Sequence, residues 1–317
     1  MDCTNRLRIV FGDYSFGVHG KEFDYIFSYG TGGLESLAVR GKEWLYRSPR
    51  PTFWRALTDN DKGCRFQLRS GMWHSADMFQ ACVGIRLLVD GQEYENPWAP
   101  NNNQWADKES AERIEIAYTY ETITVPKTTV EVTYKVDAQG TIGVKVHYFG
   151  KEELPELPVF GMRFIMPTRA ASYTYEGLSG ETYPDRMAGG IPGVYKVEGM
   201  PVTPYMVPQD CGVHMATKWV EITRNYVKNN ADNGDEEFSL RFEMDEAPFA
   251  FSCLPYTAQE LENASHHEEL PLPRRCVLSV LGAVRGVGGI NSWGADVEEP
   301  YRISGEKDIC YSFKICF

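Results

Sequence analysis

The chain has 317 residues, 43% hydrophobic and 13% aromatic, so it can enclose a large apolar core. Its formal net charge of −12 argues against nucleic acid and an anionic membrane surface as partners. No run approaches the ~18 consecutive apolar residues of a membrane span, and the first residues lack the apolar core of a signal peptide. We therefore expect a cytoplasmic protein.

Cysteine and histidine, the usual metal ligands, form no convincing pattern. The eight cysteines are scattered without a C-x-x-C pair, so we expect reduced thiols, mostly small and buried. His266 and His267 are adjacent and would point to opposite faces of a strand. With the two glutamates that follow, they fit a solvated loop better than a metal site. We expect no metal in this chain.

The first part of the chain alternates strand-like and turn-like segments. Residues 5–48 interleave short apolar runs with glycine-containing turns, which predicts a meander of strands. Residues 51–63 break this pattern with a polar tip at 58–61. Residues 68–83 are the best helix candidate, because their apolar residues recur near helical spacing.

Apolar residues alternate most regularly over 113–148, on both sides of a turn at 137–140. This pattern predicts a β-hairpin with one buried face, and the last strand, 309–317, repeats it. There is no alternation of strands with helices and no repeat of fixed period. We therefore expect an all-β, mostly antiparallel fold, built as one large sandwich.

A glycine-rich segment, GAVRGVGGINSWG (282–294), contains five glycines and ends in Asn291, Ser292, Trp293 and Gly294. Glycine permits tight turns and close backbone approaches. The segment is typical of an exposed turn that presents one aromatic face and a few polar groups, as sugar sites do. A tight corner with Trp293 packed in the core is an equal alternative. A dinucleotide fingerprint is excluded, because no helix pattern follows.

Two pairs of acids are candidates for glycosidase chemistry, which needs two carboxyl groups about 5–10 Å apart. They are Asp59 with Asp61, and Glu181 with Asp185. Acids this close in sequence usually cap turns or pair with arginine, and each pair has an arginine nearby. We expect neither pair to be catalytic. A G-x-S-x-G nucleophile motif is also absent from the sequence.

Several long motifs carry a resemblance over nearly the whole chain. They are PTFWRALTDNDKG (51–63), LPVFGMRFIMP (157–167), YEGLSGETYPDRMAG (175–189), PYMVPQDCGVHM (204–215), FSCLPYTAQELENASH (251–266) and GAVRGVGGINSWG (282–294). On these motifs the chain resembles the small subunits of heterodimeric β-galactosidases of lactic-acid bacteria. Those subunits are equivalent to the C-terminal domain of single-chain β-galactosidases of glycoside hydrolase family 2.

The resemblance implies a galactose-mutarotase-like β-supersandwich, with residues 1–317 as one domain. It also implies a non-catalytic but required subunit of an enzyme that hydrolyses β-galactosides such as lactose. In that family both catalytic glutamates and the catalytic magnesium lie on a (β/α)8 barrel in the large subunit. We therefore expect that subunit as the partner, and no cofactor in this chain.

By the same resemblance, Trp293 takes the place of a tryptophan that lines the active-site mouth and stacks on sugar, chiefly at the aglycone position. Asn291 is a second candidate for sugar contact, although it stands where the family leads us to expect an acidic residue. Two corner loops are carried over as structural or interface elements through Asp59, Asp61, Glu181 and Asp185. The alternatives are a free-standing aldose mutarotase-like enzyme and a carbohydrate-binding module.

Overall fold

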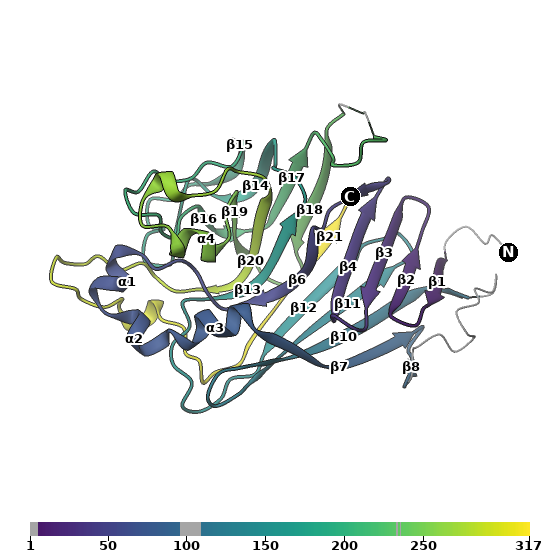
Figure 1. The fold of residues 1–317 in the computed structure, drawn as a ribbon, viewed down its shortest axis with the longest axis horizontal. Coiled ribbons are helices and arrows are strands. Elements are labelled where there is room, and N and C mark those ends of the chain that lie inside the picture. Colours follow the sequence, from purple (N-terminus) through teal and green to yellow (C-terminus); the bar gives the residue numbers. More distant parts are fainter. Residues whose placement is uncertain (1–5, 96–108, 233, 235) are drawn as a thin grey trace.

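Three antiparallel sheets form the framework of the computed structural model, which describes residues 6–95, 109–232, 234 and 236–317 (Figure 1). The first is six-stranded, in the order β5-β4-β3-β2-β1-β9. Its strands are β1 (Leu7–Phe11), β2 (Ser15–His19), β3 (Phe23–Ser28), β4 (Gly33–Val39), β5 (Lys42–Glu43) and β9 (Ser110–Ala111). Consecutive strands from β1 to β5 pair with one another, which confirms the meander predicted at the start of the chain.

The largest sheet is ten-stranded, in the order β15-β14-β17-β18-β21-β12-β11-β10-β7-β8. Its strands are β7 (Gln80–Val89), β8 (Gln92–Tyr94), β10 (Arg113–Thr122), β11 (Thr129–Asp137), β12 (Ile142–Tyr148), β14 (Ser172–Leu178), β15 (Pro192–Glu198), β17 (Trp219–Arg224), β18 (Phe238–Met244) and β21 (Ile309–Cys316). The predicted hairpin forms β11 and β12, and the last strand lies beside it as β21. Their alternating apolar side chains are buried on one face, as expected.

The third sheet is five-stranded, in the order β16-β19-β20-β13-β6. Its strands are β6 (Arg47–Thr52), β13 (Val159–Met166), β16 (Val213–Thr217), β19 (Phe249–Leu254) and β20 (Cys276–Val284). All six residues of β19 are buried and five of them are apolar, so burial on this strand does not alternate between two faces. The expected fold class, all-β with antiparallel sheets, is confirmed.

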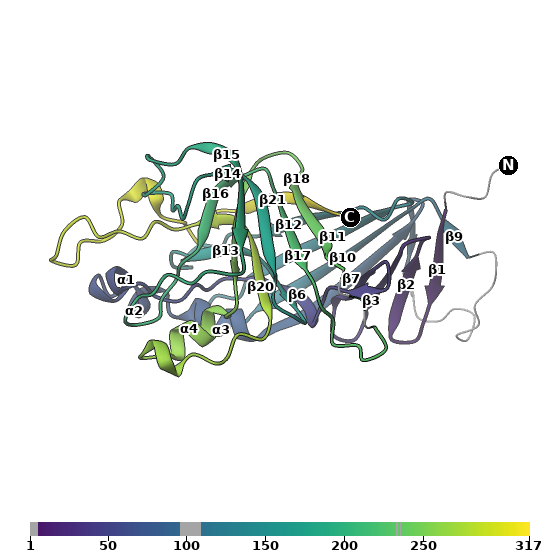
Figure 2. The same cartoon turned by 90° about the horizontal axis from the view of Figure 1, so that it is seen from above.

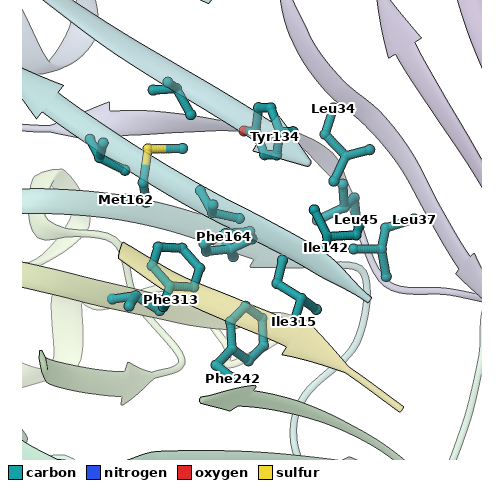
Figure 3. Close-up of a cluster of buried hydrophobic side chains, with 14 of the residues drawn as sticks. Leu34, Leu37, Leu45, Tyr134, Ile142, Met162, Phe164, Phe242, Phe313 and Ile315 are labelled. Carbon is teal, nitrogen blue, oxygen red and sulfur yellow. The ribbon is translucent and has the colours of Figure 1, made fainter. Parts of the chain in front are cut away.

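One core joins the three sheets. Phe27 of β3 packs against Tyr134 of β11, with ring centroids 5.6 Å apart. Phe164 of β13 contacts Phe242 of β18 and Phe313 of β21, with centroids 5.1 and 6.1 Å apart. Figure 3 shows side chains from all three sheets converging in this way. The ten-stranded sheet thus buries its inner face against both smaller sheets.

The helix predicted over residues 68–83 is wrong in its extent. The structure has α2 (Phe66–Ser70) and α3 (Met72–Met78), and β7 begins at Gln80. Phe79 adopts an extended backbone, and Gln80 pairs with Thr122 of β10. Phe79 is 58% exposed, so it does not continue the helix's buried face. Pairing with β10 therefore overrides an apolar spacing that resembled a longer helix.

The remaining helical elements are short. They are α1 (Asp59–Gly63), α4 (Ala258–Asn263) and two 3-10 turns, η1 (His267–Glu269) and η2 (Glu299–Tyr301). Within the described ranges no helix is long and apolar enough to cross a membrane. The cysteines there are all free thiols, as expected, and Cys3 lies outside those ranges.

Candidate functional site

Most of the glycine-rich segment lies in a loop, residues 285–298, that connects β20 to η2 and reaches beyond α1 and α2 (Figures 1 and 2). Trp293 is 92% exposed on this loop, and Ile290 is 55% exposed. An indole this exposed costs hydrophobic free energy unless a ligand or partner covers it. Of the two arrangements expected from the glycine-rich sequence, the structure has the exposed one. Its contact with sugar stays a prediction.

At two of its glycines the loop approaches α1 so closely that a side chain would not fit. Gly294 has a φ of +77°, and a β-carbon added there would lie 2.8 Å from the carbonyl oxygen of Gly63. Gly289 has a φ of +79°, and an added β-carbon would lie 2.8 Å from the side chain of Asn60. Both positions combine a left-handed backbone with close contact to α1, a combination that glycine alone tolerates. The glycines therefore seat the loop against α1.

Asn291 shapes the turn that carries Trp293. Its side-chain oxygen accepts hydrogen bonds from the backbone N–H of Trp293 at 2.9 Å and of Ala295 at 3.3 Å. Such an Asx turn is a common use of asparagine in tight loops. The side-chain oxygen of Asn291 thus accepts hydrogen bonds within the loop. A contact between Asn291 and sugar stays a prediction.

Asp185 bonds the backbone near the start of the loop. Its carboxylate accepts hydrogen bonds from the backbone N–H groups of Val287 at 2.9 Å and Gly288 at 2.7 Å. The side chain of Asn60 donates to the carbonyl oxygen of Val287 at 2.9 Å, and Arg186 donates to that of Gly288. The backbone at residues 287–288 is therefore bonded to two separate segments of the chain.

Asp61 lies beneath the loop as the centre of a buried ion-pair network. It is 1% exposed and closes a capping box with Thr58 at the start of α1. Its carboxylate lies 3.0 Å from Arg55 and 3.1 Å from Arg285, the residue at which the loop begins. A buried charge needs such partners to offset its lost hydration. Asp61 thus joins α1 to the base of the loop.

Arg285 continues the network to the far end of the loop. It lies 2.5 Å from Asp296, which in turn lies 2.7 Å from Arg69 of α2. The guanidinium of Arg285 also stacks over the ring of Phe66, 4.2 Å from its centroid. Burial would raise the pKa of Asp296, but the hydrogen bond from Arg69 and the charge of Arg285 together lower it to about 2. Both ends of the loop are therefore anchored by charge.

The other two predicted acids lie at the surface. Asp59 exchanges two hydrogen bonds with the side chain of Gln209, through its backbone N–H at 3.1 Å and its carboxylate at 3.0 Å. Glu181 accepts a hydrogen bond from Thr203 at 2.8 Å. In neither predicted pair are both carboxyl groups free for acid–base chemistry, because Asp61 and Asp185 use their oxygens in the contacts described above.

Arg55 also links the ion-pair network to a further acid, Asp210. Asp210 accepts a hydrogen bond from Tyr183 at 2.8 Å and lies 4.0 Å from Arg55. Burial raises its pKa to about 6, although the charge of Arg55 opposes that shift. Asp210 and Arg55 line a small cavity of about 30 Å³. This volume holds about one water molecule and is too small for a sugar.

A mutarotase-like enzyme would need a histidine base and a glutamate in one cleft, and neither His214 nor His266 is placed in that way. His214 is 5% exposed, and its ring nitrogens contact the hydroxyl of Tyr173 at 3.1 Å and the carbonyl oxygen of Gly180 at 2.8 Å. Burial lowers its pKa to about 4. His266 lies at the surface, 3.1 Å from Glu269. Over the described part of the chain, no group of three or more His, Cys, Asp or Glu side chains could hold a metal ion.

Three residues that shape this site escape notice in the sequence: Arg285, Asp296 and Asn60. Only their positions in the sequence could have pointed to them. Arg285 and Asp296 flank the glycine-rich loop, and Asn60 lies within the polar tip at 58–61. Nothing in a pattern of residue types shows that charges 224 positions apart, such as Asp61 and Arg285, meet in one buried network.

Comparisons with known proteins agree with the residue-level resemblance. A family model described as beta galactosidase small chain matches residues 19–315. The chain is 60% identical to a β-galactosidase small subunit of Latilactobacillus sakei, over 100% of this chain and 99% of that protein. It is 33% identical to a longer β-galactosidase of Halalkalibacterium halodurans, over 99% of this chain but 28% of that protein.

Solved structures resemble the chain weakly and in fold alone. A galactose mutarotase-like protein from Lactobacillus casei ATCC 334 aligns with 95% of this chain and 99% of its own, at 10% identity and a TM-score of 0.40. A galactose 1-epimerase from Lactobacillus acidophilus NCFM aligns with 95% of this chain and 93% of its own, at 9% identity and a TM-score of 0.39. The sequence comparisons are decisive: this chain belongs to the β-galactosidase small chain family.

Proposed function

We propose that this chain completes the active-site mouth of a cytoplasmic β-galactosidase whose chemistry is done by a large subunit. In this proposal the large subunit supplies the (β/α)8 barrel, both catalytic glutamates and the magnesium ion, and the enzyme hydrolyses terminal β-D-galactosides such as lactose. The small subunit supplies Trp293 for the sugar at the aglycone position. Asn291 is the secondary candidate for a polar contact.

One observation carries the sugar-binding part of this proposal: Trp293 is 92% exposed on a loop whose two ends are anchored by buried charge. Sugar rings have apolar faces that stack on indole, and a rigid aromatic presents that surface at low entropic cost. The partner part rests on the 60% identity to a β-galactosidase small subunit over essentially both full lengths.

A mixing experiment tests the division of labour. The purified chain, the purified large subunit and their mixture are each assayed with a chromogenic β-galactoside and with lactose. We expect turnover from the mixture alone, and co-elution of the two chains at micromolar concentration. Steady galactosidase turnover by the purified chain, or two chains that stay separate, would contradict the proposal. Mutarotation of galactose by the chain alone would support the mutarotase alternative instead.

A substitution of Trp293 tests the sugar contact in the assembled enzyme. Stacking of an indole on a sugar contributes roughly 1–3 kcal/mol, and its loss corresponds to about a 5- to 150-fold change in affinity. Trp293→Ala should therefore raise KM for lactose, with a smaller effect on kcat for an activated aryl galactoside. Tyr14→Ala is a matched control, because Tyr14 is a 57% exposed aromatic in the turn between β1 and β2. An unchanged KM for lactose in Trp293→Ala would mean that Trp293 does not contact the sugar.

A further inference from the structure

The position of an exposed indole depends on its loop, because Trp293 itself has almost no packing partners. A loop that samples many conformations must be ordered when substrate binds, which weakens binding. A loop held in one conformation avoids this loss. The contacts at residues 287–288, near the start of the loop, therefore bear on how well Trp293 meets a sugar.

Asp185 makes the most direct of these contacts. Its two carboxylate oxygens each accept one backbone N–H, from Val287 at 2.9 Å and from Gly288 at 2.7 Å. A β-carbon added at Gly286 would lie 2.8 Å from the carboxyl carbon of Asp185, so the carboxylate rests directly on loop backbone. Charge-assisted hydrogen bonds of this kind are stronger than bonds between neutral groups.

Further contacts along the loop connect the backbone held by Asp185 to the turn that carries Trp293. The side chain of Asn60 donates a hydrogen bond to the carbonyl oxygen of Val287, at 2.9 Å. Asn291 ties the backbone around Trp293 into a turn, and Gly294 lies against Gly63 of α1. Between the contact at 287–288 and the turn at 291 only Gly289 and Ile290 intervene, so little slack remains for the indole.

We propose that Asp185 is the positioning residue for Trp293, setting the place of the indole through the backbone of residues 287–288 without touching substrate. This inference rests on the proposed sugar contact of Trp293. It assigns to Asp185 a specific action on substrate binding, in place of the general structural or interface role expected from its sequence.

The test is a double-mutant cycle in the enzyme assembled with its large subunit. Asp185→Asn keeps the shape of the side chain but replaces one acceptor oxygen with an N–H donor, which faces a backbone N–H of the loop. We expect KM for lactose to rise about 3- to 10-fold, with kcat for an aryl galactoside within about 2-fold of wild type. In a Trp293→Ala background the same change should raise KM no further, because its effect passes through the indole. An equal rise in both backgrounds would overturn the inference.

A second measurement separates the positioning from the sugar contact. Amide hydrogen exchange in residues 286–294 should be faster in Asp185→Asn than in wild type, because two backbone bonds are weakened. Glu181→Gln is the matched control, since Glu181 lies four residues earlier and bonds Thr203 rather than the loop. Faster exchange with an unchanged KM in Trp293→Ala would refute the sugar contact alone. Unchanged exchange in Asp185→Asn would refute the positioning.

Discussion

Along the hairpin strands β11 and β12 nearly every inward side chain is apolar, whereas beneath the loop that carries Trp293 the buried groups are charged. Ile142, Val146 and Tyr134 are at most 1% exposed in the first region. Asp61 and Arg285 are equally buried in the second, at 1% and 0% exposure. The same degree of burial is thus reached by opposite chemistry.

The two kinds of buried group differ in how strictly they fix the position of the segments that they join. Apolar packing is non-directional and tolerates small changes of shape. A buried ion-pair network is directional, and loss of one partner leaves an uncompensated charge. A network of that kind fixes how two segments meet, so it suits the end of the molecule where a surface loop needs one conformation. Four predictions test this contrast, from the largest expected effect on folding to the smallest.

The largest effect is expected for Asp61→Asn, which removes one charge while conserving shape. Arg55 and Arg285 would remain buried beside a neutral amide, and breaking a buried pair in this way costs about 3–5 kcal/mol of folding free energy. Urea unfolding of the purified chain measures this loss. We expect it to appear also as weaker assembly with the large subunit rather than as a specific loss of kcat.

Asp59→Asn is the matched control for that substitution. Asp59 is exposed on the same short helix and contacts Gln209 rather than an arginine. Its change should alter the free energy of unfolding by no more than about 0.5 kcal/mol. Equal losses in the two variants would mean that the ion-pair network does not stabilise this end of the molecule.

The second prediction concerns pH, through Asp210 and His214, whose pKa values are shifted in opposite directions. Burial raises the pKa of Asp210 from 3.8 to about 6 and lowers that of His214 from 6.5 to about 4. Because its pKa is raised in the folded chain, protonation of Asp210 contributes to the free energy of unfolding. This contribution is fully present below the unfolded pKa and is lost as pH rises through about 6. Because its pKa is lowered in the folded chain, the neutral form of His214 contributes to the free energy of unfolding. This contribution is fully present above the unfolded pKa and is lost as pH falls from 6.5 towards 4. In the wild-type chain the two contributions therefore offset each other.

Single variants should uncover each contribution, at about 3 kcal/mol by the usual conversion of ~1.4 kcal/mol per pKa unit. On acidification from pH 6.5 to pH 4, Asp210→Asn should lose stability relative to wild type, and His214→Gln should gain it. The measurement is the free energy of unfolding in urea at pH 4, 5 and 6.5. Curves that run parallel to wild type at all three values would show that neither group titrates abnormally.

The third prediction addresses the apolar region with an equally conservative change. Ile142→Val removes one buried methyl group from β12 and should cost about 0.5–1.5 kcal/mol. Because no charge is involved, the loss should not change between low and high salt. The two urea curves at two salt concentrations measure this. A loss in Ile142→Val as large as that in Asp61→Asn would remove the contrast.

The same contrast explains what could be predicted from the sequence. The alternation in β11 and β12 is a local pattern that a pleated strand requires, so the hairpin and its buried face were predictable. The flanking glycines are compatible with an exposed Trp293, but a core position remained an equal alternative. Deciding between the two required the tertiary contacts of the loop.

Long-range polar pairing was not predictable from residue types. Asp61 and Arg285 lie 224 positions apart, and no local pattern links them. The extent of the helix predicted over 68–83 failed for a related reason, because pairing of β7 with β10 decides the conformation after Met78. Apolar periodicity reports the face of an element, while its partners and its end depend on the rest of the fold.

The smallest effect on folding is expected at the residue most important for the proposed function. Trp293 is 92% exposed, so Trp293→Ala removes little buried area and should change the free energy of unfolding by no more than about 0.5 kcal/mol. A buried tryptophan would instead cost about 3–5 kcal/mol. Thermal and urea unfolding of the chain alone distinguish these values without any activity measurement. A large loss of stability would mean that the indole packs against the protein in solution, leaving no free face for a sugar. An unchanged stability together with a raised KM for lactose would place the role of Trp293 in binding alone, on a loop whose shape is maintained by the charges beneath it.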